Sequence, residues 1–439
     1  MALTVAEGTR LPPGLRLPRV VQGLAFISNR RRTLHFLRRR YGTAFSVNLP
    51  IFGRAVVISD PAMVKQLYLT STELVTNIEP NLGRVLGRGS FFNLEGDAHR
   101  NQRKLLVPPF HGRRMHAYEV IIEEETMREA DSWPEGAEFE TLAPMMRITL
   151  NAILRAVFGA EGVEFEQLRE LLPPFVEFAS RLVTIPVPTW NLGPWAPWGR
   201  FHAYRRRFDA TVGQLIAKAK NDPDLQDRDD VLALMVQARY DDGYAMSDRE
   251  IADQLLTLLA AGHETTATTL AWAIERLRRH PDVLSRLVDE VDAGGSELRQ
   301  ATIIEVQRSR PVIDMAGRTV KADSLRLGEW VIPKGHKVIV GIGLVHADDA
   351  VFPDAQRFDP DRFVGVSPDL YAWVPFGGGT RRCIGAAFAN MEMDVVLRTL
   401  LRTFDIGTTS APDEPWHSRG VAYAPGRRGR AVVSRRQLL

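Results

Sequence analysis

Cys383 is the only cysteine in the chain, and its neighbours suit a thiolate better than a buried thiol. It follows three consecutive glycines, Gly377 to Gly379, whose backbone amides are free to turn inward. Two adjacent arginines and the start of an apolar helical run from Ala386 to Leu401 add positive potential. Cations and amide donors lower the pKa of a thiol, whereas an inert core cysteine lies among apolar side chains. Cys383 is therefore predicted to work as a thiolate.

A thiolate held by glycine turns is either a nucleophile or an axial metal ligand. A nucleophile needs a histidine base, and no sequence feature pairs one with Cys383. A single cysteine also forms no intramolecular disulfide and no cysteine-based zinc knuckle, and it fits a reducing compartment. The residues alone leave both uses of the thiolate open.

A second group of reactive residues lies in a predicted helix that begins at Ser247 and stops before Pro281. Ser247 to Glu250 has the spacing of a capping box. About 33 residues at ~1.5 Å each give a helix of roughly 50 Å, long enough to cross a domain of this size. Its middle, Leu255 to Ile274, is apolar nearly all round, so we expect this part to be buried.

Inside this segment, Ala261 to Thr266 reads Ala-Gly-His-Glu-Thr-Thr, a poor choice for helix stability. Glycine costs roughly 1 kcal/mol against alanine, and clustered threonines crowd the preceding turn. Residues that weaken a helix in this way are expected mainly at functional sites. Ala261 and Thr265 lie one turn apart on the same face of the helix. We therefore expect a gap beside the small Ala261 side chain, with the Thr265 hydroxyl pointing into it. Glu264, the residue before Thr265, is a candidate proton source. The alternative is a core helix whose threonines bond the carbonyls one turn earlier.

The composition is that of a globular protein, with 45% hydrophobic and 25% charged residues among 439. The net charge of +3 argues against a dedicated nucleic-acid binder. An apolar stretch from Val20 to Ile27 is too short to span a membrane, which takes roughly 20 apolar residues. We find no repeat or linker and predict a single domain over residues 1–439, soluble and cytoplasmic.

The rest of the chain predicts a mainly α fold with small β-sheets. A basic helix is expected at Thr33–Tyr41, and a hairpin of Thr43–Leu49 and Ala55–Ser59 across residues 50–54. Helical periodicity follows to about Lys220. We expect breaks in it at the prolines and at a Trp/Pro-rich stretch: Pro80, Pro108-Pro109, Pro134, Pro173-Pro174 and residues 185–198.

The loop around Cys383 matches a ten-residue motif, Phe-x-x-Gly-x-Arg-x-Cys-x-Gly. The matching residues are Phe376, Gly379, Arg381, Cys383 and Gly385. It resembles the haem-thiolate loop of the cytochrome P450 superfamily, and Ala261–Thr266 is similar to that family's oxygen-activation motif. The resemblance implies a cytochrome P450 fold with the long helix crossing over the haem. It also implies haem b (iron protoporphyrin IX) as cofactor, with Cys383 as its axial thiolate and iron ligand.

Further elements of the family appear in the expected order. Glu305 and Arg308 resemble its Glu-x-x-Arg pair, and Arg362 stands in a segment similar to its Pro-x-Arg-Phe element. The resemblance implies that these three form a buried charge triad, since buried ions persist only when mutually paired. Taken alone, Glu305 and Arg308 would more often be a surface pair.

The resemblance also implies ligands for the anionic edge of the haem. His99 and Arg103 look like the family's pattern of an aromatic residue or histidine followed four residues later by arginine. Together with Arg381 and Arg318 they are the candidates to bind the two propionates, which need cationic donors. For Arg318 an ordinary surface position is as well supported.

The activity implied is hydroxylation of an organic substrate with O2, the second oxygen atom leaving as water. The Cys383 thiolate donates electron density that favours O–O cleavage. Thr265 would hydrogen-bond to oxygen at the iron, and Glu264 would relay protons from water.

Electrons are expected from a separate partner, because the chain has no dinucleotide fingerprint and no length for a flavin domain. In soluble bacterial relatives this partner is usually a ferredoxin with its reductase, and NAD(P)H is the final donor. A basic docking face is predicted from Arg100, Arg103, Lys104, Arg113, Arg114 and Arg382. Two basic runs are predicted to be solvated charge: Arg38–Arg40, and the tail residues Arg427, Arg428 and Arg430 with Arg435 and Arg436.

The substrate is poorly encoded in the sequence, and an apolar molecule is the general expectation. The candidate pocket residues are Phe91, Phe92, Leu258, Ala261, Val312, Ile313 and Met315. Trp190, Trp195 and Trp198 are candidates for a lid over the entrance. For all of these, core packing is the alternative.

Two other functions fit a haem-thiolate protein. One is a haem-bound sensor or ligand carrier without turnover, and the other is an enzyme that uses peroxide or rearranges its substrate without a redox partner. The Glu264-Thr265 pair speaks against both.

Overall fold

The computed structural model describes residues 9–50, 53–78, 82–110, 112, 114–159, 162–184, 190, 193–240 and 243–437. The chain forms two compact units. The first, here called the sheet unit, comprises Met1–Pro80, Ile313–Arg357 and Pro368–Cys383. The second, the helical unit, comprises Asn81–Val312, Phe358–Ser367 and Ile384–Leu439. The single domain expected from the sequence stays a prediction.

The sheet unit is built on a mixed five-stranded sheet of order β1-β2-β8-β5-β3. Its strands are β1 (Ala44–Leu49), β2 (Gly53–Ile58), β3 (Val75–Asn77), β5 (Met315–Val320) and β8 (Lys337–Gly341), and a separate hairpin joins β6 (Ser324–Leu327) to β7 (Trp330–Pro333). β1 and β2 pair antiparallel with Leu49 opposite Gly53, which confirms the predicted hairpin; residues 51 and 52 of its turn lie outside the described residues.

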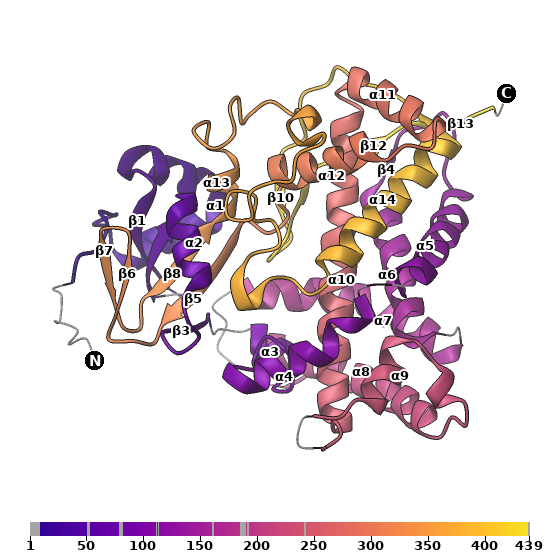
Figure 1. Cartoon of the computed structure of the whole chain (residues 1–439), viewed down its shortest axis with the longest axis horizontal. Helices are drawn as coiled ribbons and strands as arrows, with labels where there is room; N and C mark the ends of the chain where they lie inside the picture. Colours follow the sequence, from indigo (N-terminus) through magenta and orange to yellow (C-terminus); the bar gives the residue numbers. More distant parts are fainter. Residues whose placement is uncertain are drawn as a thin grey trace. The chain divides into compact units, whose positions relative to one another are not determined.

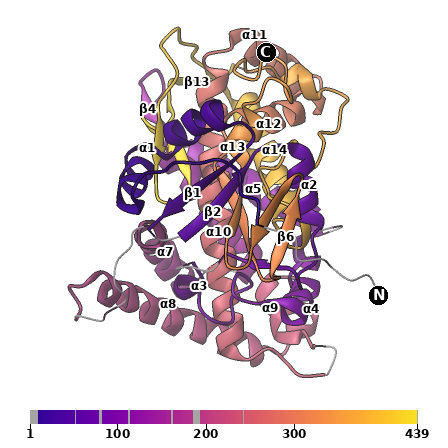
Figure 2. The same ribbon diagram turned by 90° about the vertical axis from the view of Figure 1, so that its left-hand side faces the viewer.

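Three helices complete the sheet unit: α1 (Arg19–Tyr41), α2 (Pro61–Leu69) and α13 (Ile342–His346). α1 packs on β1, as Figure 2 shows, and it begins well before the predicted start at Thr33. Asn29 has non-helical backbone angles, so α1 is kinked there. The early start was missed because the first half of α1 presents aliphatic side chains to solvent, a reversal of the usual helical pattern.

The helical unit confirms the mainly α prediction. Its helices are α3 (Leu82–Leu86), α4 (Gly96–Leu106), α5 (Arg114–Ala130), α6 (Leu142–Phe158), α7 (Val163–Thr184), α8 (Pro197–Lys220), α9 (Val231–Gln237), α10 (Asp248–Leu277), α11 (Pro281–Asp292), α12 (Glu297–Ser309) and α14 (Ala386–Thr403). Short sheets pair β4 (Phe139–Glu140) with β12 (Arg430–Ala431), β9 (Phe404–Ile406) with β13 (Val433–Arg435), and β10 (Trp416–Ser418) with β11 (Tyr423–Pro425).

α10 is the longest helix that the structure describes, with 30 residues, and α6, α12 and α14 pack against it (Figure 1). It begins with the predicted capping box, in which the Ser247 hydroxyl accepts from the Glu250 amide and the Glu250 carboxylate accepts from the Ser247 amide. Most of its length is buried, as predicted from the apolar pattern. A helix covered on all sides holds its polar residues in fixed places, which suits a catalytic element.

Of the helix breaks expected at prolines, the one at Pro173-Pro174 is wrong, and the one at Pro80 stays a prediction. α7 runs through Pro173 and Pro174 without a break, because Leu172 and Phe175 beside them are fully buried and anchor both halves of the helix. Pro80 lies outside the described residues. No helix in the described part of the chain is long and apolar enough to cross a membrane.

Candidate functional site

The loop that carries Cys383 is shaped by glycines. Gly377 and Gly379 have φ of +65° and +64°, a left-handed conformation that other residues rarely adopt. A short 3₁₀ turn over Gly379–Arg381 follows, and the Cys383 amide donates to the Phe376 carbonyl oxygen at 3.0 Å, which closes the loop. The Cys383 side chain is exposed. The loop therefore presents the thiol outward from a fixed backbone.

Tyr68 of α2 explains why the middle of this loop must be glycine. A Cβ atom at Gly378 would overlap the Tyr68 ring, and one at Gly379 would overlap the Tyr68 carbonyl oxygen. α2 thus supports the loop from one side. The Tyr68 hydroxyl is buried without a hydrogen-bond partner among the described residues, and burial raises its pKa to about 12.

Arg318 on β5 is buried beside the same loop, with 8% of its surface exposed. Its Nη2 donates to the Gly378 carbonyl oxygen at 3.0 Å, and its guanidinium lies 5.7 Å from the centre of the Tyr68 ring. Burial lowers the pKa of Arg318, and its hydrogen bonds go to the backbone carbonyl oxygens of Gly317 and Gly378. The surface alternative for Arg318 is therefore wrong. A buried cation of this kind fits an anionic ligand.

In the helical unit, the cover over α10 is interrupted at Ala261 and its neighbours. From Ile251 to Leu277 every residue is buried except Ala260, Ala261, Gly262 and Thr265. The Thr265 hydroxyl donates to the Ala261 carbonyl oxygen at 2.8 Å, the bond to the preceding turn that the alternative interpretation expected. Thr265 is nevertheless half-exposed at this opening. The arrangement thus combines a bonded hydroxyl with the predicted gap on the Ala261 face.

Glu264 is buried and has a partner that the sequence did not reveal. Its Oε1 accepts from Nε of Arg419 at 3.0 Å. Arg419 lies in the turn between β10 and β11, where its carbonyl oxygen accepts from the Ser180 hydroxyl of α7 at 3.1 Å. No local pattern indicates this pair, since 155 residues separate the partners.

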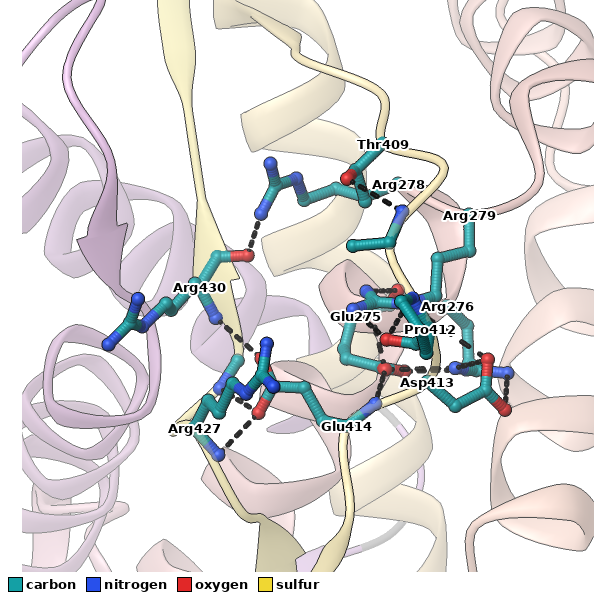
Figure 3. A network of polar contacts seen from close by, with 12 residues as sticks. Glu275, Arg276, Arg278, Arg279, Thr409, Pro412, Asp413, Glu414, Arg427 and Arg430 are labelled. Atoms are coloured by element: carbon teal, nitrogen blue, oxygen red, sulfur yellow. Dashed lines mark hydrogen bonds and ion pairs between the residues drawn. The ribbon is translucent and has the colours of Figure 1, made fainter.

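A network of buried charges fixes the segment that leads to Arg419. At the end of α10, the Glu275 carboxylate accepts from the Glu414 amide at 2.8 Å and from Arg276 beside it (Figure 3). Arg276 also donates a hydrogen bond to the Asp413 carboxylate at 2.9 Å. Partial burial raises the pKa of Asp413, but the hydrogen bond and the charge of Arg276 outweigh it, so the pKa is lowered. The Glu414 carboxylate in turn accepts amides of the C-terminal segment. The β10–β11 hairpin is thus anchored on the helix that carries Glu264.

The three residues expected to form a charge triad lie together. Glu305 and Arg308 form two hydrogen bonds of 2.6 Å, and both are almost fully buried. Arg362 lies 3.9 Å from the Glu305 carboxylate, which also accepts from the Asp359 amide at 2.9 Å. Burial raises the pKa of Glu305, and the Arg308 hydrogen bonds oppose that shift.

The remaining predicted residues are placed as follows. His99 and Arg103 lie one turn apart on α4, and the buried His99 ring is 4.3 Å from Phe91. Phe91, Leu258 and Val312 are buried, Phe92 and Ala261 are exposed, and Ile313 and Met315 are half-buried. Phe376, Arg381, Cys383, Arg318, Ile313 and Met315 belong to the sheet unit, and Gly385 and the other predicted site residues belong to the helical unit.

The surface predictions have mixed outcomes. Trp198 is buried against Phe201, so it is part of the core and not of a lid; Trp190 and Trp195 are exposed, and residues 185–189 and 191–192 lie outside the described residues. In the basic runs, Arg39 and Arg40 are exposed as predicted, whereas Arg38 pairs with Asp348 and Arg436 pairs with Asp292 at 2.6 Å. Arg113 and the side chain of Arg114 lie outside the described residues.

Comparison with known proteins settles the family. The model of the cytochrome P450 family matches residues 11–426. The chain is 57% identical to the protein named cytochrome P450 138 of Mycobacterium tuberculosis, over 97% of each chain. This chain belongs to the cytochrome P450 family. It is also 38% identical to cytochrome P450 135B1 of Mycobacterium bovis, over 96% of this chain and 91% of the relative. The fold matches retinoic acid bound cyanobacterial CYP120A1 with a TM-score of 0.87 and 24% identity, over 98% of this chain and all of that one.

Membership of the P450 family identifies the cofactor. The family binds haem through a cysteine thiolate, and Cys383 is the only cysteine available, so it is the axial ligand. The observed residues fit this group: the exposed thiol suits the iron, and the buried Arg318 suits an anionic haem edge. Among the described residues no cluster of three or more His, Cys, Asp or Glu is arranged to hold another metal. This P450 is a haem-thiolate monooxygenase that acts on a small molecule and takes electrons from a redox partner.

The Glu264–Arg419 pair predicts a loss of stability on mutation. Arg419→Ala leaves the buried Glu264 carboxylate without its cation, and an orphaned buried charge of this kind costs the folded state about 3–5 kcal/mol. The variant's melting temperature should fall accordingly, whereas Arg419→Lys should keep most of the stability. Arg181→Ala is the matched control, because it removes an exposed pair with Glu177, worth less than about 1 kcal/mol. An equal effect of both alanine variants would contradict the prediction.

Glu392 of α14 gives a prediction about the pH dependence of stability. Its carboxyl is buried and hydrogen-bonded to Thr266, and burial raises its pKa well above the usual value. Stability that depends on a raised acid pKa is complete below the unfolded-state pKa and is lost as the pH rises through the folded-state pKa. Glu392→Gln should therefore gain over wild type with rising pH, by up to about 1.4 kcal/mol per pH unit above the unfolded-state pKa.

Melting temperatures of the haem-loaded proteins between about pH 5 and pH 8 check this prediction. Glu166→Gln serves as the control, because the Glu166 side chain is 59% exposed. A gap between Glu392→Gln and wild type that stays constant with pH would show that Glu392 is ionised in the folded protein.

Proposed function

We propose that this P450 hydroxylates a small apolar organic molecule with electrons from a ferredoxin and its reductase, NAD(P)H being the final donor. The observation that carries the proposal is the exposed thiol of the only cysteine at the end of the glycine loop. Haem bound through a thiolate supplies reductive activation of O2. One oxygen atom enters the substrate and the other leaves as water, so two electrons and two protons are consumed.

The residues of α10 are proposed to handle the protons. Glu264 is held in place by Arg419, and it adjoins Thr265 at the part of the helix that is not covered. We expect the Glu264 carboxylate and the Thr265 hydroxyl, at successive positions of this helix, to pass protons from water. The small Ala261 on the same face leaves room beside the Thr265 hydroxyl.

The other predicted site residues have proposed roles in the sheet unit and the helical unit. Arg318, Arg381, His99 and Arg103 are proposed to bind the propionates of the haem. Glu305, Arg308 and Arg362 are proposed to brace the structure on the cysteine side. The apolar candidates Phe91, Phe92, Leu258, Val312, Ile313 and Met315 are proposed to contact the substrate; their side chains carry no charge, which supports an apolar molecule.

The docking of a ferredoxin is proposed to use basic side chains. Lys104 and Arg382 are exposed, and Arg100 is exposed while paired with Asp97. Ferredoxins present acidic surfaces, so complementary charge would raise the association rate. The cytoplasmic location and the single domain over residues 1–439 remain predictions with this proposal.

Oxygen uptake by the purified haem protein tests the function. With a surrogate ferredoxin, its reductase and NADPH, we expect O2 consumption that rises with substrates found by a shift of the iron spin state. A panel of apolar and polar compounds of equal size separates the substrate classes. Spin-state shifts by polar compounds only would exclude an apolar substrate, and turnover with peroxide but none with reduced ferredoxin would exclude the proposed electron source.

Thr265→Val tests the proton route, since valine keeps the shape and removes the hydroxyl. We expect product formation per electron to fall by about ten- to a hundredfold while NADPH is still consumed, because reduction continues without productive protonation. Thr269→Val is the control, one turn along α10, where the hydroxyl donates to the Thr265 carbonyl oxygen at 3.0 Å. Unchanged coupling in Thr265→Val would exclude the role of this hydroxyl.

A further inference from the structure

The first half of α1 has its faces reversed compared with an ordinary surface helix. Its outer face consists of aliphatic side chains with exposed fractions of 45% to 70%: Val20, Val21, Leu24 and Ile27, and Leu17 just before the helix is 50% exposed. Within the helix, Val20, Val21, Leu24 and Ile27 follow the spacing i, i+1, i+4 and i+7, so they form one stripe, and Leu17 precedes it in the chain. Exposed apolar patches of this kind mark interaction sites.

The inner face of the same segment is held by polar and backbone contacts. Gln22 is 2% exposed. Its side-chain Nε2 donates to the Leu17 carbonyl oxygen at 2.8 Å, and its side-chain Oε1 accepts from the Asn48 backbone amide at 2.9 Å. A Cβ atom at Gly23 would overlap Pro50. The helix is therefore fixed in this orientation by specific contacts, and the aliphatic stripe is not free to rotate into the core.

The segment that carries the stripe is strongly basic, although Arg30 and Arg38 of α1 pair with Asp314 and Asp348. Between Gly8 and Ser59 the sequence contains ten arginines and not one aspartate or glutamate. Arg16, Arg19, Arg32, Arg39 and Arg40 are exposed. A helix with an aliphatic face and basic flanks is the type that lies in the headgroup region of an anionic bilayer.

We propose that α1 docks this protein on an anionic lipid surface, with the stripe Leu17, Val20, Val21, Leu24 and Ile27 in the interface. The chemistry favours lipid over a protein partner, because the stripe is purely aliphatic and lacks the tryptophan and tyrosine anchors of protein interfaces. The helix lies in the plane of the surface and does not cross it. The inference does not depend on the substrate or on the electron donor.

Co-sedimentation with vesicles tests the proposal on the haem-loaded protein. We expect binding to vesicles of phosphatidylcholine with phosphatidylglycerol, weaker binding to phosphatidylcholine alone, and loss of the difference at high salt. Leu24→Ser with Ile27→Ser should weaken binding about tenfold or more, and Arg16→Gln with Arg32→Gln should weaken only the anionic component. Val366→Ser with Leu370→Ser is the matched control, because these side chains are 57% and 55% exposed elsewhere in the chain.

A probe on the stripe gives an independent readout. Leu24→Cys can be labelled with an environment-sensitive dye while Cys383 is bound to haem, and its emission should shift to the blue on anionic vesicles. Failure of the wild-type protein to bind them, or equal binding by the serine double variant, would overturn the proposal. Concentration-dependent dimers that the Leu24→Ser with Ile27→Ser variant abolishes, without vesicle binding, would assign the stripe to a second copy of the chain instead.

Discussion

Cys383→Ser should abolish the red-shifted absorption band that the reduced protein gives with carbon monoxide, and with it the turnover of any substrate. The band reports a thiolate ligand, and the chain contains no second cysteine to replace it. A serine hydroxyl is a poor donor at neutral pH, so the electron density that favours O–O cleavage is lost. We expect turnover to fall below about a thousandth of the wild-type rate.

The structure allows this variant to be separated from misfolding. The Cys383 side chain is exposed and its amide bond to the Phe376 carbonyl oxygen does not involve the sulfur, so the loop should keep its backbone in Cys383→Ser. Circular dichroism should be unchanged. Arg382→Gln, at the neighbouring exposed position, should keep the carbon monoxide band in full. A red-shifted band in Cys383→Ser would refute the assignment of the ligand.

Local signals in the sequence predicted the elements that are determined locally. The capping box at Ser247, the hairpin of β1 and β2, and the helix after Cys383 depend on residues close together in the chain, and all three are present. α7 was mispredicted because a proline rule describes the backbone alone. Each proline costs about 3 kcal/mol in a helix interior, yet buried apolar residues on both sides outweigh that cost.

The sequence identified the acid of the proposed proton route but not what holds it. Glu264 was found because it breaks the apolar pattern of α10, whereas Arg419 looks like any arginine in a turn. Only the fold shows that the hairpin carrying Arg419 contacts Ser180 and is anchored through Glu275 and Glu414. Partners separated by more than a hundred residues leave no pattern in a single sequence. The same holds for Thr266 and Glu392.

Burial was the other property that sequence reasoning judged poorly. The sequence around Arg318 fits a surface position as well as a buried one, and the structure shows Arg318 buried at the cysteine loop beside Tyr68. In contrast, α1 was expected to be an ordinary basic helix, and its first half exposes the aliphatic stripe. Whether a residue is covered depends on elements from distant parts of the chain, which the periodicity of one segment does not report.

Arg308→Ala should destabilise the protein by about 3–5 kcal/mol, the usual result of removing one partner from a buried ion pair. Glu305 would remain almost fully buried, with Arg362 at 3.9 Å as the nearest remaining cation of the triad. Since Glu305 also accepts from the Asp359 amide, the loss should loosen the segment that carries Arg362. The measurement is the urea midpoint of the haem-loaded protein, followed by circular dichroism and by release of haem.

A matched pair on the same segment controls for charge removal as such. Arg286 pairs with Asp361 through bonds of 3.0 and 2.6 Å, but both side chains are about half exposed, so Arg286→Ala should cost less than about 1 kcal/mol. Glu305→Leu combined with Arg308→Met should recover most of the stability, because the penalty lies in the orphaned charge and not in the lost attraction. If Arg308→Ala cost no more than Arg286→Ala, the buried pair would not stabilise the helical unit in the way that its burial predicts.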